Sequence, residues 1–386
     1  MRVLTGLDCL IADGATQLLG RRVGLATHPA AVTGDLTDSV TALLRCGVTL
    51  TALFGPEHGF SGAVADGQRV QDAVYRDTQL PIYSLYGTAQ EPTPAMLADV
   101  DVLVFDMQDV GVRFYTFIST LFYVLKGAAK ADIPVVVLDR PNPLNGIVRE
   151  GPVLAPGFES FVGVLPIPLR YGLTMGELAY YMNETQGLRA DLTVIPMVRW
   201  QRGFWFDETG LTWAPTSPAM PHLSTAMVYP GTCFLEGTNV SEGRGTALPF
   251  EVCGAPWIDG EALAAHLNVL ALPGVRFRPT QFVPAASKFA GEVCAGVQIH
   301  VLDRATFRPV TAGLHLLAAL KALYLLDFAW LPQSWEGARP HIDLLAGTDQ
   351  VRRAVDAGMD VAGLVAGWAD AVAVFEDACR PYALYP

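Results

Sequence analysis

The sequence has little charge, and most of the charge it has is negative. Only 17% of its 386 residues are charged, and 38 Asp and Glu against 26 Lys and Arg give a formal net charge of −12. A chain this acidic is a poor partner for nucleic acid or for an anionic membrane surface. We therefore expect no nucleic-acid ligand.

Cysteine pairs and long apolar runs are also missing. The six cysteines are scattered, and none forms the C-x-x-C pair typical of zinc or redox sites, so we predict no metal site. No run reaches the ~18 apolar residues of a membrane span. Residues 1–8 do not resemble a signal peptide, because their apolar stretch is short and is interrupted by Asp8. We expect no membrane span and a cytoplasmic location, or secretion if a leader was removed.

Three common catalytic motifs are absent as well. The first predicted strand is followed by THPAA at residues 27–31 and not by the G-x-G-x-x-G turn that binds dinucleotides. Neither a P-loop nor the G-x-S-x-G elbow of serine hydrolases is present. We therefore expect no cofactor and no serine nucleophile.

The chain is rich in hydrophobic residues, which make up 51% of the total. Their spacing predicts strands that alternate with helices. Because the predicted strands are apolar throughout, we expect an α/β fold with a mostly parallel sheet covered on both faces over residues 1–228. A smaller α+β domain should follow over residues 229–386. The predicted strands are 21–27, 48–54, 80–85, 102–106, 135–139, 192–196 and 296–301. The predicted helices are 35–46, a short one from 93, 114–131, one from 173, 260–270, 312–325 and 360–378.

The segment TALFGPEHGFSG at residues 51–62 is the clearest candidate for a site. An apolar strand breaks at Gly55-Pro56 and is followed at once by Glu57 and His58. Polar side chains just beyond the carboxyl ends of strands are where open α/β sheets place their chemistry. A carboxyl group there suits general-acid catalysis. His58 could orient it, act as a base, or only bond to the loop backbone.

Four other polar residues share this position at the end of a predicted strand: His28, Asp106, Asp109 and Asp139. Together with Glu57 they indicate a site along one edge of the sheet. Asp109 could instead form a structural salt bridge with Arg113, and Asp139 could cap a helix. Stiff prolines on both sides would hold Asn142 in place.

A glycine-rich segment at residues 236–246, EGTNVSEGRGT, is the second candidate region. Its glycines permit close approach of a ligand to the backbone. Arg244 could bind a carboxylate through two parallel hydrogen bonds, or it could simply pair with Glu242. Tyr115 could stack on a sugar face, although aromatic residues in such positions more often belong to the core.

Five segments together resemble the NamZ family of exo-β-N-acetylmuramidases. They are FGPEHGF at 54–60, FDMQDVGVRFYT at 105–116, LDRPNP at 138–143, YPGT at 229–232 and EGTNVSEGRGT at 236–246. The resemblance implies a Rossmann-like N-terminal domain and a smaller C-terminal domain, with the active site in the cleft between them. The family commonly has Asn where this chain has His28. Its secreted members carry a leader.

The resemblance also implies an activity: release of N-acetylmuramic acid from the non-reducing end of peptidoglycan fragments. Glu57 occupies the place of the family's proposed catalytic glutamate. Either the acetamido group of the substrate or a second carboxylate would stabilise the oxocarbenium-like centre. The candidates for that carboxylate are Asp106, Asp109 and Glu242. Arg113 or Arg244 could bind the lactyl carboxylate of the sugar.

Two alternatives belong to other functional classes. One is a metal-dependent hydrolase using His28, His58, Asp106 and Asp109, although no tight ligand spacing such as H-E-x-x-H supports it. The other is a two-lobed sugar-binding protein without catalysis. Turnover of a chromogenic muraminide would exclude the second, and turnover after exhaustive chelation would exclude the first.

Overall fold

The structure is a computed structural model, and it describes residues 2–64, 68, 70–75, 79–333, 337, 339–358 and 360–386. Its N-terminal half is built on a seven-stranded sheet with the order β3-β4-β2-β1-β5-β6-β7. All neighbouring strands are parallel except β3 and β4. The strands are β1 (Arg22–Thr27), β2 (Thr49–Gly55), β3 (Ala73–Tyr75), β4 (Leu80–Ser84), β5 (Val102–Asp106), β6 (Val135–Leu138) and β7 (Leu192–Ile195).

The chain reverses its direction of travel across the sheet next to β1. From β1 it moves outward to β2 and β4, and it then returns to the other side of β1 as β5 before continuing to β6 and β7. Loops diverge at such a switch point and leave a crevice beyond the carboxyl ends of the strands. His28, Glu57 and Asp106 follow or end the three strands at this point.

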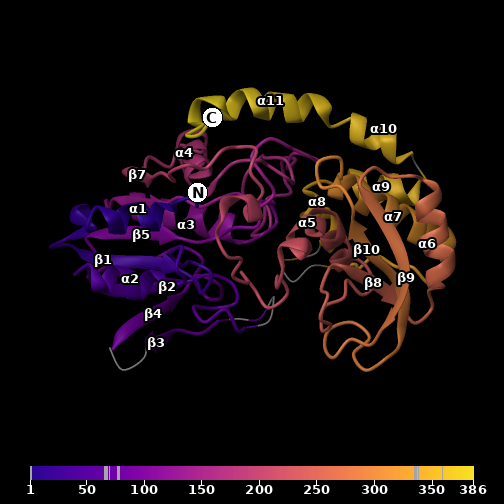
Figure 1. Cartoon of the computed structure of the whole chain (residues 1–386), viewed down its shortest axis with the longest axis horizontal. Helices are drawn as coiled ribbons and strands as arrows, with labels where there is room; N and C mark the ends of the chain where they lie inside the picture. Colours follow the sequence, from indigo (N-terminus) through magenta and orange to yellow (C-terminus); the bar gives the residue numbers. More distant parts are fainter. Residues whose placement is uncertain are drawn as a thin grey trace.

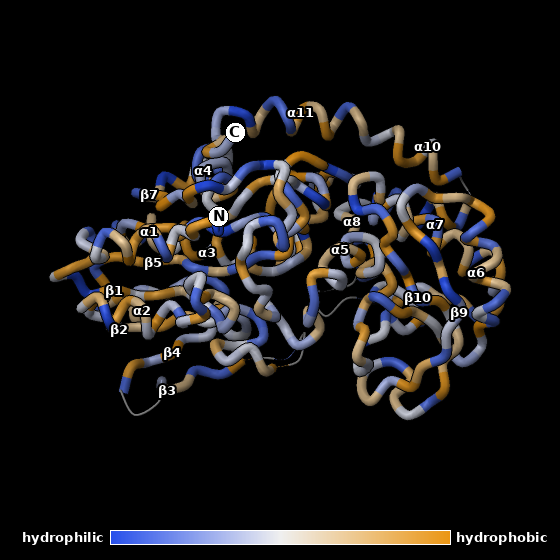
Figure 2. Tube along the Cα trace, viewed as in Figure 1, coloured by the Kyte–Doolittle hydropathy of each residue, from blue (hydrophilic) through white to orange (hydrophobic). Residues whose placement is uncertain are grey.

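Both faces of this sheet are covered, which explains why central strands such as β5 are fully buried and almost wholly apolar (Figure 2). One face packs with α1 (Gly6–Ala12) and α2 (Ser39–Arg45) around Leu7, Leu25 and Leu43. The core on the other face includes α3 (Phe117–Lys130) and α4 (Met175–Thr185). Thr174 and Glu177 form a capping box at the start of α4, the helix predicted from residue 173.

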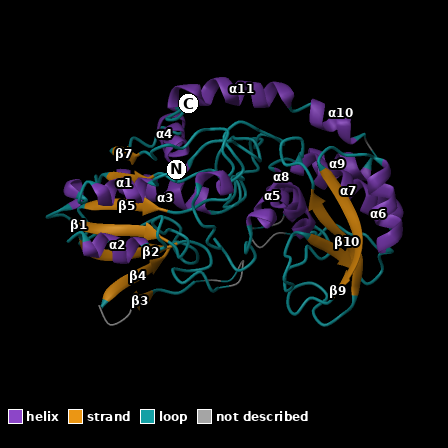
Figure 3. Cartoon of the chain, viewed as in Figure 1, coloured by secondary structure: helices purple, strands orange, loops and turns teal. Residues whose placement is uncertain are grey.

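The C-terminal part contains a three-stranded antiparallel sheet with the order β8-β10-β9. Helices pack beside this sheet (Figure 3). The strands are β8 (Val252–Ala255), β9 (Val275–Phe282) and β10 (Cys294–Val301). The helices are α5 (Leu223–Thr232), α6 (Gly260–Val269), α7 (Pro309–Leu323), α8 (His341–Ala346), α9 (Gln350–Asp356), α10 (Val361–Ala366) and α11 (Ala369–Cys379).

The two parts are tied together by the end of the chain. In Figure 1, α11 runs back from the C-terminal part across the N-terminal part. Beyond it, the Tyr385 hydroxyl donates a hydrogen bond to the Asp139 carboxylate and accepts one from the Met197 backbone N–H at 2.8 Å. The predicted C-terminal domain therefore ends on the N-terminal one.

The predicted fold class is confirmed: a mostly parallel, Rossmann-like sheet with helices, followed by a smaller domain with its own sheet. The domain boundary predicted at residue 228 falls inside α5. Because α5 packs against α7, we propose that the boundary precedes Leu223. The short helix predicted from Thr93 is wrong, since residues 94–99 form only turns before β5 begins. Among the described residues, no helix is long and apolar enough to cross a membrane.

Candidate active site

Glu57 and His58 are the two central residues of a tight turn directly after β2. The turn is closed by a hydrogen bond of 3.0 Å from the Gly59 N–H to the Pro56 carbonyl. His58 has φ of +70°, a left-handed conformation that a non-glycine residue adopts at a cost. Gly55 is needed because a Cβ there would lie 2.7 Å from the backbone nitrogen of Phe60. The turn thus holds a carboxyl group and an imidazole rigidly at the sheet edge.

Both side chains are buried and held by hydrogen bonds. Glu57 is 7% exposed, and its Oε2 accepts a hydrogen bond of 2.7 Å from the Thr116 hydroxyl, at the start of α3. The Nδ1 of His58 lies 2.8 Å from the carbonyl oxygen of Val64. Because a carbonyl can only accept, Nδ1 carries a proton, and Nε2 of a neutral ring is then an acceptor. His58 therefore makes the expected loop contact and also lines a cavity.

That cavity is formed by both parts of the chain. Its N-terminal wall contains Glu57, His58 and Tyr115, and its C-terminal wall contains Glu236 and Arg244. The sequence-predicted Glu57 loop and glycine-rich segment therefore share one cavity, although nearly two hundred residues separate them. The cavity is narrow, with a volume of about 40 Å³.

Arg244 is the cationic group in this wall. Its Nε and Nη2 donate to one carboxylate oxygen of Glu236 at 2.8 and 2.6 Å, and its guanidinium lies 4.9 Å from the centre of the Phe250 ring. Glu242, the partner considered from the sequence, is farther from Arg244 Nε at 3.6 Å. Glu242 is instead bound by the Lys288 ammonium at 3.0 Å. Glu236 thus lines the cavity of Glu57, whereas Glu242 is not among the residues that line it.

Tyr115 and His28 support the neighbouring loop and strand end. The Tyr115 hydroxyl donates to the Thr216 hydroxyl at 2.7 Å. His28 accepts the backbone N–H of Gln108 on Nε2 at 2.9 Å, and its ring packs edge-on against Phe117. Burial and the nearby Arg140 guanidinium lower the pKa of His28 to about 3, so its ring is neutral. Tyr115 lines the cavity, whereas His28 orders the loop after β5.

Asp106 is held away from the cavity by a buried ion pair. It is 0% exposed, and Arg140 binds its two oxygens at 2.5 and 2.9 Å. The Ser39 hydroxyl is a third donor at 2.5 Å. These contacts join the ends of β5 and β6, so the structure gives Asp106 a structural position.

Three further predicted residues are also used within the fold. Asp109 accepts hydrogen bonds from the Gly111 N–H at 2.7 Å and from the Tyr171 hydroxyl. Asp139 accepts from the Thr174 hydroxyl at 2.8 Å and the Gly176 N–H at 2.7 Å, both at the start of α4. The Asn142 amide donates to the Leu173 carbonyl at 2.9 Å. These contacts brace the loops behind the cavity.

Arg113 is a buried connector between the two parts of the chain. It is 1% exposed, and it donates to the carbonyl oxygens of Pro152 at 2.8 Å, Ile167 at 2.9 Å and Leu345 at 3.1 Å. The salt bridge with Asp109 considered from the sequence does not form. Burial lowers the pKa of Arg113 to about 9. With these carbonyl partners, its guanidinium is not placed to receive a substrate.

The structure does not gather the ligands of the proposed metal site. Within the described part of the chain, no three His, Cys, Asp or Glu side chains cluster in a way that could hold a metal ion. His28, His58 and Asp106 are each engaged by the protein contacts above. Sequence reasoning missed Glu236 and Thr116 in the cavity, although both lie within the quoted motifs. To select these two residues from their motifs, one must know which side chains of each motif point into the cavity, and the sequence does not show this.

Comparisons with known proteins extend over the whole chain. Residues 23–224 match the N-terminal model, and residues 227–385 the C-terminal model, of the family described as exo-β-N-acetylmuramidase NamZ. The chain is 44% identical over 385 residues to the peptidoglycan β-N-acetylmuramidase NamZ of Bacillus subtilis (strain 168), covering 100% of this chain and 92% of that protein.

Two solved structures of DUF1343-family proteins from Bacteroides fragilis NCTC 9343 are also similar. One has a TM-score of 0.91 at 36% identity, and the other has a TM-score of 0.79 at 30% identity. In both cases the match covers 100% of this chain and 99% of the other. With both family models matched in order along the sequence, this chain belongs to the NamZ family of exo-β-N-acetylmuramidases.

Proposed function

We propose that this protein is an exo-acting β-N-acetylmuramidase that releases N-acetylmuramic acid from the non-reducing end of peptidoglycan fragments. The observation that carries the proposal is the shared cavity. It places a buried carboxyl group, Glu57, in one wall and a carboxylate-binding cation, Arg244, in the other. Cleavage of a muraminide needs both an acid and a cation, because its glycosidic oxygen must be protonated and its lactyl group carries a negatively charged carboxylate.

Glu57 acts as the general acid. Its carboxyl group gives a proton to the glycosidic oxygen as the bond to the anomeric carbon breaks, so the leaving sugar departs as a neutral alcohol. The Thr116 hydroxyl, 2.7 Å from Oε2, fixes the orientation of the carboxyl group. The tight turn that contains Glu57 and His58 restricts the backbone, so the carboxyl group of Glu57 stays directed into the cavity.

The positive charge that develops on the sugar ring needs a second group. Of the carboxylates considered from the sequence, Asp106 is bound by Arg140, Asp109 by Tyr171 and Glu242 by Lys288. Among the described residues of the cavity, Glu236 is the further carboxylate, so it joins the substrate's own acetamido group as the candidate for this role. Substrate binding would then separate Glu236 from Arg244.

Arg244 would bind the lactyl carboxylate through its planar guanidinium. In this structure the same guanidinium atoms bind Glu236, and the cavity of about 40 Å³ is too narrow for a pyranose ring. The two walls belong to different parts of the chain. We therefore propose that they separate to admit the substrate and close on it, as many enzyme clefts do.

The experiment is hydrolysis of N-acetylmuraminyl-β-1,4-N-acetylglucosamine by the wild type and by Glu57→Gln. General acid catalysis typically contributes about 10²–10⁴-fold, so the variant should lose that much of kcat while its unfolding temperature stays the same. Glu251→Gln, a buried glutamate that bonds Ser224 and Thr225 outside the cavity, is the matched control. Wild-type protein that turns over no muraminide would refute the function, and an active Glu57→Gln would refute the acid.

A further inference from the structure

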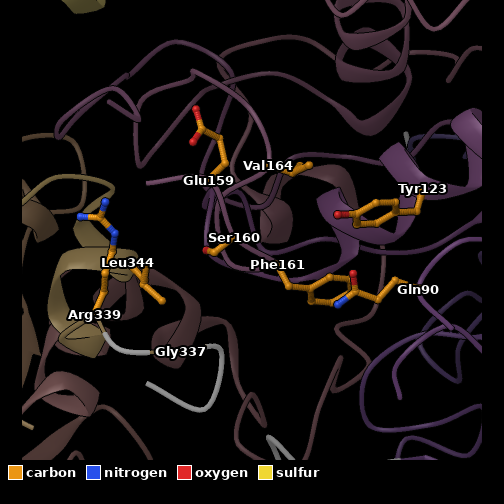
Figure 4. Close-up of a pocket in the computed structure, with 9 residues that line it drawn as sticks. All are labelled: Gln90, Tyr123, Glu159, Ser160, Phe161, Val164, Gly337, Arg339 and Leu344. Carbon is orange, nitrogen blue, oxygen red and sulfur yellow. The ribbon is translucent and has the colours of Figure 1, made fainter. Parts of the chain in front are cut away.

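Arg244, which would bind the lactyl carboxylate, is the cation on which anion recognition in the cavity depends. Among the described residues that line the Glu57 cavity, it is the only arginine or lysine. Another arginine, Arg339, lines a different hollow of about 660 Å³, where Figure 4 shows it beside Leu344. The Arg339 guanidinium lies 4.4 Å from the centre of the Phe158 ring. The groups that surround Arg244 therefore bear directly on substrate specificity.

The turn that carries Arg244 is packed tightly against the loop that joins β9 and β10. Gly243 and Gly245 flank Arg244, and both have φ of +80°, a conformation that favours glycine. The Gly245 carbonyl accepts a hydrogen bond of 2.8 Å from the Ala285 N–H. A Cβ on Gly245 would lie 2.5 Å from the backbone nitrogen of Ala286. The backbone of Arg244 is thus fixed relative to this loop.

The same loop supplies Lys288, whose ammonium group is fully used within the protein. It donates to the carbonyl oxygens of Leu235 at 2.8 Å and Val240 at 3.0 Å, and to Oε2 of Glu242 at 3.0 Å. A lysine has three N–H donors, so these contacts account for all of them. The Glu242 side chain is only 3% exposed, and a carboxylate this deeply buried needs a charged partner. Lys288 provides it.

Glu242 is also the second described carboxylate beside Arg244. Glu236 accepts from the Nε and Nη2 of Arg244 at 2.8 and 2.6 Å, while Oε1 of Glu242 lies 3.6 Å from the same Nε. A movement of less than about 1 Å would bring Glu242 within hydrogen-bond distance of Arg244. When the lactyl carboxylate takes the place of Glu236, Glu242 is therefore the nearest described competitor for Arg244.

From these contacts we infer that Lys288 is a positioning residue for substrate recognition. It holds Glu242 away from Arg244, so that the guanidinium can exchange Glu236 for the lactyl carboxylate. The inference rests on the proposed function and extends it to the charges around the binding arginine. Without Lys288, Glu242 is a buried carboxylate that turns toward Arg244 and competes with the substrate for it.

The test measures kcat/KM of Lys288→Met for an aryl muraminide and an aryl glucosaminide, at mildly alkaline pH so that carboxyl groups are ionised. The muraminide value should fall about tenfold, chiefly through KM, because a charge-assisted hydrogen bond to the lactyl carboxylate is then contested. The glucosaminide has no lactyl group, so its value should change little and the ratio should fall. Lys288→Gln, whose amide still donates hydrogen bonds, should show the same fall.

A second substitution separates this role from simple support of the loop. Glu242→Gln removes the competing charge, so the double variant Lys288→Met/Glu242→Gln should recover most of the lost ratio. Glu242→Gln alone should not lower the ratio. If Lys288 only braced the carbonyls of Leu235 and Val240, its loss would affect both substrates alike, and removal of Glu242 would not restore the muraminide.

Lys321→Met is the matched control. The Lys321 side chain is 24% exposed against 22% for Lys288, it pairs with Asp356 at 3.4 Å, and it does not line the cavity. Its loss should leave the ratio unchanged. An unchanged ratio in Lys288→Met, a fall in Glu242→Gln alone, or no recovery in the double variant would each overturn the inference while the wild type remains an active muramidase. A wild type that cleaves no muraminide refutes the proposed function itself, and the inference falls with it.

Discussion

At the scale of single residues, Arg244 is where specificity should be decided. Removing a charge-assisted hydrogen bond typically costs about 1.5–3 kcal/mol, so Arg244→Ala should lower kcat/KM for an aryl muraminide by about one to two orders of magnitude. An aryl glucosaminide lacks the lactyl carboxylate and should lose much less. The measurement is the ratio of the two kcat/KM values in the variant and in the wild type.

Arg113→Ala is the matched control for that measurement. Its guanidinium is buried against three backbone carbonyls, so its loss should lower the unfolding temperature and leave the substrate ratio unchanged. If Arg113→Ala and not Arg244→Ala removes the preference for the muraminide, then Arg113 binds the lactyl carboxylate and Arg244 does not.

A second residue-scale prediction concerns Asp109 and pH. Burial raises the pKa of Asp109 from 3.8 to about 6, although its Oδ2 accepts two hydrogen bonds. The folded protein therefore holds this proton more tightly than the unfolded chain. The stabilisation is complete below about pH 4 and is lost as the pH rises through 6. A shift of about two units corresponds to about 3 kcal/mol.

Asp109→Asn removes this titration while keeping the shape of the side chain. The variant's free energy of unfolding, measured in urea between pH 4 and pH 7.5, should decline less with rising pH than that of the wild type. The other buried acids titrate in both proteins and cancel in the difference. Parallel curves for the two proteins would show that Asp109 is ionised throughout this range.

At the scale of elements, the crossing of α5 and α7 depends on two glycines. A Cβ on Gly313 would lie 2.3 Å from the Gly231 carbonyl oxygen, and one on Gly231 would lie 1.9 Å from the Pro309 oxygen. Backbone atoms cannot yield as side chains do. Gly313→Ala should therefore destabilise the protein by about 1–3 kcal/mol through overpacking, despite the better helix propensity of alanine.

Gly363 is the control for this effect, because it is also a helical glycine. Its added Cβ would meet nothing closer than 3.7 Å, so Gly363→Ala should be neutral or stabilising by up to about 1 kcal/mol. Chemical denaturation of the two variants gives the comparison. A Gly313→Ala protein as stable as Gly363→Ala would mean that the helices do not touch at this point.

At the scale of the whole molecule, the C-terminal tail closes the structure onto the N-terminal part. Tyr385→Phe removes the hydroxyl that joins Asp139 to the Met197 N–H. Because buried polar groups then lose their partner, the free energy of unfolding should fall by about 1–3 kcal/mol. Tyr382→Phe is the control, since Tyr382 packs against Tyr181 and its hydroxyl makes no hydrogen bond within the described residues. Equal stability of the two variants would contradict a role for the tail.

Every strand of the large sheet except β3, the start of α4 and the position of Glu57 can be read from the local sequence. Each follows from local chemistry: apolar runs favour buried strands, a capping box begins a helix, and Gly-Pro ends a strand. Helix α5 is not predictable from the local sequence, because Pro230 and Gly231 lie inside it. Both residues are poor helix formers, and only the packing on α7 compensates for them.

Which polar residues meet in the cavity depends on the tertiary structure. Five of them end or follow strands at one edge, but Asp106 is neutralised by Arg140 and Asp139 caps α4. Glu57 lines the cavity together with Arg244 and Glu236. A sequence shows that a carboxylate stands at a strand end but not which donor reaches it. That depends on contacts between residues far apart in the chain, and these form only when the two parts pack together.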